Sequence, residues 1–156
     1  MSNVRTADGS IKFLQLVAAE TNPNPKGTQP NSVEVSMTRK INIAEKFAKI
    51  SEFFKPHIAA ELNGQAIKLV KVNREFVWHH HDHEDEMFLV VKGKFRMEFR
   101  DHDEWIGEGE FIVVPRGVEH RPVGEEECWI MLFEPPSTLN TGNVINERTV
   151  SELQHV

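Results

Sequence analysis

The sequence predicts an all-β fold with one helix near its N-terminal side. From residue 57 onward, short runs rich in valine, isoleucine and phenylalanine alternate with turn signals such as Asn63-Gly64 and Lys92-Gly93. Upstream of this region, one segment has the apolar periodicity of a helix. With 156 residues, the chain is long enough for a single domain with a substantial core.

Residues 1–36 are predicted to form an N-terminal arm or linker, and residues 37–156 a single domain. The stretch 22–32 is rich in proline, asparagine and glycine, which is typical of a linker. Within the arm, Ile11 to Ala19 is mildly apolar and could add an edge strand or a short helix, across a dimer interface. A disordered or loosely docked arm is the alternative.

The segment Asn42 to Phe54 is predicted to be an amphipathic helix. Asn42 can cap it, and Glu45 three residues later completes a capping box. Apolar residues recur at spacings of three and four and form one stripe: Ile43, Phe47, Ile50 and Phe54. Pro56 ends the helix.

Many short strands are expected after the helix. The candidate segments are 57–62, 65–72, 75–81, 86–92, 94–100, 103–106, 111–115 and 127–134. Short strands with frequent turns between them favour a sandwich or a barrel.

Charge and composition exclude several function classes. The formal net charge is −6 and no basic patch is visible, so a nucleic-acid partner is not expected. No apolar run approaches the roughly 18 residues of a membrane span, and the N-terminal residues make a poor signal peptide. Cys128 is the only cysteine and opens an apolar strand, so a buried, inert thiol is expected. We therefore expect a cytoplasmic protein with no membrane partner.

The first motif with chemical content lies at residues 79–93 and reads His79-x-His81-x4-Glu86-x6-Gly93. Alternate side chains of a strand share a face, so His79 and His81 point the same way and His80 points to the other face. A hairpin to the next strand would bring Glu86 beside them. His81 and His83 form a rival ligand pair, but only the earlier pair leaves four residues before Glu86.

The second motif reads Gly109-x5-Pro115-x-Gly117-x2-His120. Proline restrains φ and glycine permits unusual conformations, so this turn can aim His120 inward. Three imidazoles and one carboxylate suit one divalent ion of Fe, Mn, Ni, Cu, Co or Zn. The alternative is a solvated, histidine-rich loop at 79–83 that binds metal only adventitiously.

Together these motifs resemble the two signature motifs of the cupin superfamily, over about residues 60–134. The resemblance implies a jelly-roll barrel with a metal inside, held by His79, His81, Glu86 and His120. Asn73 and Gly124 replace a glycine and an asparagine of the family patterns, at turn positions rather than at metal ligands. The chain is similar to small single-domain cupins of the mannose-6-phosphate-isomerase-like type, a label that conveys fold more than activity. Such cupins commonly pair, which implies a homodimer.

Phe88, on the Glu86 face, is predicted to line a substrate pocket together with Met97 and Met131, whose faces the sequence leaves undetermined. The chain has no tyrosine, so the tyrosine-dependent mechanisms of thiol dioxygenases and sugar-nucleotide epimerases cannot operate unaltered. The leading hypothesis is a small metalloenzyme of dioxygenase, isomerase or lyase type that acts on a compact polar metabolite. The alternative is a non-catalytic small-molecule or metal-sensing module.

Overall fold

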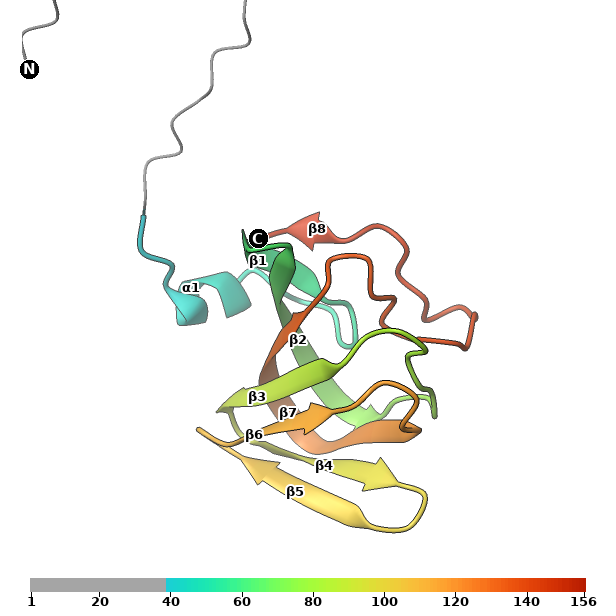
Figure 1. Ribbon diagram of the computed structural model, residues 1–156. Coiled ribbons are helices and arrows are strands. Elements are labelled where there is room, and N and C mark those ends of the chain that lie inside the picture. The colour runs from blue at the N-terminus through green and yellow to red at the C-terminus, as the bar shows by residue number, and fades with distance from the viewer. Residues whose placement is uncertain (1–38) are drawn as a thin grey trace, which may run out of the picture. The chain divides into compact units, whose positions relative to one another are not determined.

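The structure is a computed structural model that describes residues 39–156, so the predicted arm, including Ile11 to Ala19, lies outside the described residues. One short helix precedes a series of strands (Figure 1). The elements are α1 (Ile43–Phe47), β1 (His57–Leu62), β2 (Gln65–Glu75), β3 (Glu86–Lys92), β4 (Lys94–Phe99), β5 (Asp103–Gly107), β6 (Phe111–Val114), β7 (His120–Glu134) and β8 (Gln154–His155).

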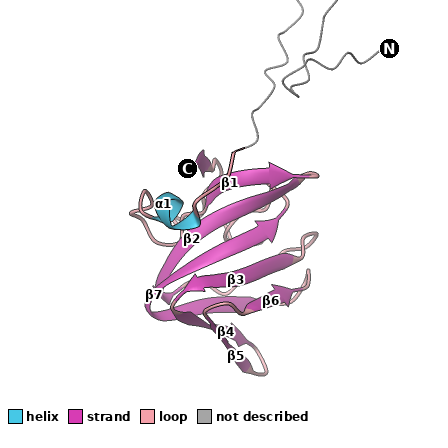
Figure 2. Ribbon diagram, turned by 90° about the vertical axis from the view of Figure 1, so that its left-hand side faces the viewer, coloured by secondary structure: helices cyan, strands magenta, loops and turns pink. Residues whose placement is uncertain are grey.

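The long strand β7 organises the sheet. β2 runs antiparallel along one edge of β7, while the other edge pairs with β4 in its first part and with β3 in its last part. β5 continues from β4, β1 and β8 continue from β2, and β6 adds to β3. The strands curl around an interior, and the curved stack is visible in Figure 2. The predicted all-β, jelly-roll type of architecture is therefore confirmed, with the sheet left open between β5 and β6.

Two apolar clusters lie on the two faces of this sheet. The interior cluster draws on six strands, β2 to β7, and includes Val70, Phe88, Phe95, Met97 and Ile130. A second cluster is centred on Phe47, Ile50 and Leu69, where α1 packs against the outer face of β2 and β7. Alternation along β2 explains the split, because Leu69 and Val70 point to opposite faces.

The helix prediction is correct at its start and wrong at its end. The Asn42 side chain accepts a hydrogen bond from the Glu45 backbone N–H at 3.3 Å, as the capping box requires. The helix nevertheless ends at Phe47 rather than at Phe54. Phe53 instead bridges to β2 at Lys71, and Phe54 takes a positive φ of 58°. Residues 48–54 therefore leave the helix despite their apolar periodicity, and Phe53 pairs with β2 instead.

The expected strand 75–81 is also wrong as a continuous element. β2 runs on to Glu75, and beyond it only His79 makes a bridge, to His120. Phe76 donates its backbone N–H to the Pro122 carbonyl at 3.0 Å, so the segment stays extended between the two contacts. Among the described residues, no helix has the length and apolar character needed to cross a membrane.

Candidate metal centre

Four side chains from three segments meet inside the sheet. One ligand atom from each of His79, His81, Glu86 and His120 lies within 4.8 Å of the others. All four side chains are buried, with residue exposures of 5% or less. Within residues 39–156, this is the one cluster with such geometry. The structure thus brings together the predicted ligand set and leaves His80 and His83 outside it.

The backbone holds two of these histidines side by side. His79 and His120 exchange two hydrogen bonds, in which the N–H of each donates to the carbonyl of the other, at 3.1 and 2.9 Å. Their rings consequently lie 4.3 Å apart, measured between centroids. His120 opens β7 and His79 follows β2, so the pairing of these two strands fixes the distance between the histidines.

The turn of the second motif is tied to the first motif. Gly117, with a φ of +77°, donates its backbone N–H to the His81 carbonyl at 2.7 Å. A side chain at this φ would be strained, which is the reason for a glycine. The neighbouring Arg116 N–H donates to the Asp85 carboxylate at 2.9 Å. Two segments about thirty residues apart are therefore locked together around the site.

Hydrogen bonds fix the orientation of two rings. Nδ1–H of His79 donates to the Val77 carbonyl, and Nδ1–H of His120 donates to the Val118 carbonyl, both at 2.9 Å. This places the lone pair on Nε2, the atom that faces the cluster, as metal-binding histidines require. The Nε2 atom of His120 is buried without a hydrogen-bond partner among the described residues. A bound cation would satisfy it, so the residues present fit a metal.

The charge states also fit a cation. Burial first, and then the neighbouring His120, lowers the pKa of His79 to about 4. Burial alone would raise the pKa of Glu86, but the neighbouring imidazoles of His120 and His81 outweigh burial and lower it. Nε2 of His81 lies 3.1 Å from Oε2 of Glu86. At neutral pH, the cluster therefore offers a neutral His79 imidazole and an ionised Glu86 carboxylate to an ion.

A small cavity of about 30 Å³ lies beside the candidate metal centre. His79 and Glu86 form its polar side, and the other walls are almost entirely apolar: Val70, Val72, Phe76, Phe88, Ile130 and Leu132. Phe54 and Asn140 also border it. Asn140 was not predicted; its Nδ2 donates to the Phe54 carbonyl at 3.1 Å. No local motif marks Asn140 or Phe54, because both reach the cavity through long-range packing.

The three predicted pocket residues have different positions. Phe88 lines the cavity, and its ring stands edge-on to His120 with centroids 6.0 Å apart. Met97 is fully buried in the interior cluster, but it is not among the residues that line this cavity. Met131 lies on the other face of β7 and packs in the Phe47 cluster. Side chains alternate between the two faces of a strand, and Met131 lies between the inward-facing Ile130 and Leu132, so it points outward.

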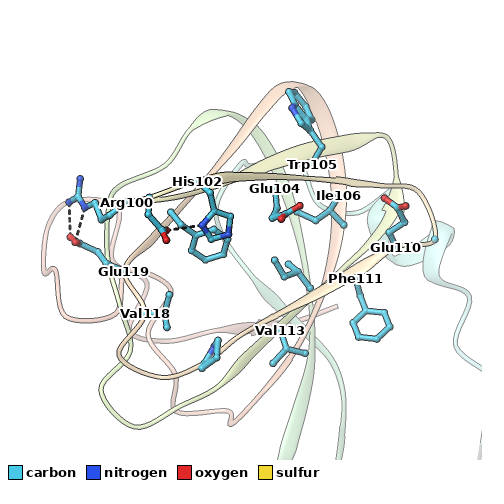
Figure 3. A pocket seen from close by; sticks show the side chains of 15 residues that line it. Arg100, His102, Glu104, Trp105, Ile106, Glu110, Phe111, Val113, Val118 and Glu119 are labelled. Atoms are coloured by element: carbon cyan, nitrogen blue, oxygen red, sulfur yellow. Dashed lines mark hydrogen bonds and ion pairs between the residues drawn. The ribbon is translucent and has the colours of Figure 1, made fainter.

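A much larger hollow, a groove of about 990 Å³, lies between β5 and β6. Figure 3 shows Trp105 and Glu104 on one side, Val113 and Phe111 on the other, and the Arg100–Glu119 ion pair at one end. None of the four clustered ligands lines this groove. The His79–Glu86 side of the cluster therefore borders the small cavity and not this larger groove.

Comparison with known proteins agrees with this geometry. The family model described as the cupin domain matches residues 67–133, which include all four clustered ligands. A cupin-2 domain protein from Shewanella frigidimarina is 45% identical, with a TM-score of 0.60 over 61% of this chain and 93% of that one. Protein NMB1881 from Neisseria meningitidis is 35% identical, with a TM-score of 0.58 over 62% and 99%.

A curated relative, the uncharacterized protein YdbB of Bacillus subtilis (strain 168), is 30% identical over 63 residues. That alignment spans 40% of this chain and 56% of the relative, little more than half its length. The matched domain, the strand topology and the buried histidine–glutamate cluster lead to one assignment. The chain belongs to the cupin superfamily.

Proposed function

We propose that this cupin binds one divalent metal ion, of Fe, Mn, Ni, Cu, Co or Zn, and uses it as a small metalloenzyme on a compact polar metabolite. His79, His81, Glu86 and His120 would hold the ion. The observation that carries the proposal is the buried Nε2 of His120, which lacks a hydrogen-bond partner and faces a carboxylate and two further imidazoles. Leaving such an atom unpaired costs about 1–3 kcal/mol.

The ligand types narrow the choice of ion. Three imidazoles argue against an oxygen-seeking ion such as Ca²⁺, whereas the six metals named above accept this set. A bound ion of this kind would supply Lewis-acid or redox chemistry toward substrate oxygens or O₂. The reaction class stays within dioxygenase, isomerase or lyase chemistry.

The protein's own contribution is a dry, narrow compartment. Phe76, Phe88 and Leu132 keep bulk water away from the ligands, which strengthens electrostatic interactions there. A cavity of about 30 Å³ holds roughly one water molecule. A metabolite therefore needs Phe54 or Phe76 to move, whereas a diatomic molecule does not.

The first test is metal analysis of anaerobically purified protein by mass spectrometry, with O₂ uptake measured during a metabolite screen. We expect about one transition-metal ion per chain. His120→Ala removes a direct ligand. Its metal affinity should therefore fall by more than the ~10- to 100-fold that is typical of substitutions at residues that only support a ligand. His80→Ala is the matched control, because its ring contacts Asp82 at 3.1 Å and not the cluster. Retention of metal by His120→Ala would contradict the proposal.

One observation favours the second candidate, a non-catalytic binding or sensing module. Among the residues lining the small cavity, His79 and Glu86 are the titratable ones, and both are proposed ligands. A catalyst often needs another acid or base near the open metal positions. Metal-loaded protein that binds metabolites in a thermal-shift screen, yet converts none of them, would favour the module.

A further inference from the structure

A second pair of charges lies buried beside the cluster. Lys68 on β2 and Glu134 at the end of β7 are 1% and 2% exposed, and Nζ lies 2.9 Å from Oε1. Nζ of Lys68 also donates to the Thr138 carbonyl at 3.1 Å. Lysine and glutamate are almost never fully buried unless paired. A buried ion pair is also weak evidence for stability, because apolar residues of the same volume often serve as well.

The register of the sheet puts this pair next to a proposed metal ligand. β3 and β7 are antiparallel, with Met87 opposite Phe133. Continuing this register by one residue sets Glu86, the first residue of β3, against Glu134, the last residue of β7, and both side chains are buried. Like charges directly opposite one another are destabilising.

One oxygen of Glu134 is left over. Oε1 contacts Lys68, but Oε2 is buried without a hydrogen-bond partner among the described residues. Nε2 of His120 also lacks a partner, and it lies 3.6 Å from Oε2 of Glu86. Two of the four buried side-chain polar atoms without a partner among the described residues thus belong to this region, together with two buried carboxylates, an arrangement that a core built for stability alone would avoid.

We propose that Glu134, held by Lys68, is a positioning residue for the metal ligand Glu86, an inference that rests on the metal-binding function proposed above. Glu134 limits the orientations open to the Glu86 carboxylate. Lys68 balances the charge of Glu134, so that the pair adds no net charge beside the ion. Groups that support a metal ligand in this way set the affinity and the coordination geometry of the ion.

The test uses the full chain and Co²⁺ as the probe, because the absorption spectrum of Co²⁺ reports ligand geometry. Glu134→Gln removes the negative charge at nearly constant shape and leaves Lys68 without its partner. We expect Co²⁺ affinity, measured by competition with a chromophoric chelator, to fall about 10- to 100-fold and the visible bands to shift. The matched control is Glu98→Gln, which alters another buried carboxylate, one that is bound to Arg96 and Arg121. It should leave the spectrum unchanged.

Because Glu134→Gln leaves a buried charge unpaired, it can fail to fold. The double variant Lys68→Met/Glu134→Leu removes both charges and should fold, since apolar replacement of a buried pair is tolerated. It should still show weaker Co²⁺ binding and altered bands. Wild-type affinity and an unchanged spectrum in a folded variant would overturn the positioning role alone. Wild-type protein that binds no Co²⁺ would instead overturn the metal-binding function on which the role depends.

Discussion

The rings of Phe54 and Phe76 stack beside the candidate metal centre, with centroids 4.7 Å apart and planes inclined by 15°. Phe54 is held there by its backbone: its N–H donates to the Lys71 carbonyl at 2.8 Å and its carbonyl accepts from Asn140. Both rings border the small cavity that His79 and Glu86 line. The pair therefore controls how much space a ligand has at the proposed ion.

Replacing Phe54 by alanine should open this cavity. We expect azide to bind faster to the Co²⁺-loaded protein, as followed by stopped-flow absorbance. The free energy of unfolding should fall by about 2 kcal/mol, less than the 3–5 kcal/mol of a fully buried phenylalanine, because Phe54 is only partly buried. The control is Phe53→Ala, which removes a ring that is 40% exposed. Equal azide rates in both variants would show that Phe54 does not limit access.

The lowered pKa of His79 predicts a pH dependence of the metal-free protein. The unfolded chain takes up a proton near the ordinary histidine pKa of 6.5, whereas native His79 does so only near 4. Between these values the unfolded state binds more protons, so stability falls as pH falls from 6.5 to 4. The full effect of His79 is about 3 kcal/mol, at 1.36 kcal/mol per pKa unit.

Urea unfolding of chelator-treated protein between pH 7 and pH 4.5 checks this expectation. Glu134, with its raised pKa, has the opposite sign above the ordinary glutamate value of 4.5. Wild type must therefore be compared with His79→Gln, which lacks the His79 contribution. The slope of stability against pH should be shallower in the variant. Parallel slopes would mean that His79 titrates normally.

With metal present, protons and the ion compete for the same imidazole nitrogens. Metal should raise the melting temperature at pH 7.5, because a ligand of the native state stabilises it by mass action. The increase should be smaller at pH 5.5. Since the pKa of His79 is about 4, this ligand stays available at pH 5.5 and some stabilisation should remain. Equal increases at both pH values would argue against a three-histidine site.

Gly142 lies where the C-terminal segment crosses the histidine loop. Its φ is +50°, and a Cβ there would come within 2.2 Å of the His80 carbonyl oxygen and 3.2 Å of the His79 ring. Gly142→Ala should therefore lower both stability and metal affinity. Gly109→Ala is the matched control, because its φ is +82° but the space around it is open. That control should cost only the conformational term of about 1–2 kcal/mol, and similar melting temperatures for both variants would count against the close packing of Gly142.

The homodimer stays a prediction. Light scattering should give about twice the chain mass of 17.9 kDa. A monomer at high micromolar concentration would contradict it. Deleting residues 1–36 separates the two roles considered for the arm: an unchanged number of chains per particle and an unchanged melting temperature would show that the arm contributes nothing to assembly or stability.

The proximity of His79, His81, Glu86 and His120 could be predicted from the sequence because the information that specifies it is local. The spacing of His79, His81 and Glu86, and the glycine–proline turn before His120, are readable from the chain and reappear in the structure. Most strand boundaries follow from alternation and turn residues in the same way. The strand expected at 127–134 is longer than predicted, since β7 begins at His120 and runs to Glu134.

The missed features all depend on partners distant in sequence. The helix ends at Phe47, and Phe53 forms a β-bridge with Lys71 on β2. No local sequence pattern predicts that contact. Met131 can be placed outward by counting alternate residues from the inward-facing His120, but only once β7 is known to run as one strand from His120 to Glu134. Lys68 and Glu134 likewise carry no local signal of burial, because their pairing joins two strands that are distant in sequence.

The central position of β7 also constrains the order in which the strands can pair during folding. β7 is one of the last strands in the chain, yet it must pair with β2, β3 and β4 before His120 reaches His79. These contacts span long stretches of chain, and such topologies fold slowly. The four ligands therefore come together only when the sheet is nearly complete. A metal ion would therefore bind late in folding, after the sheet has formed, and would not nucleate folding.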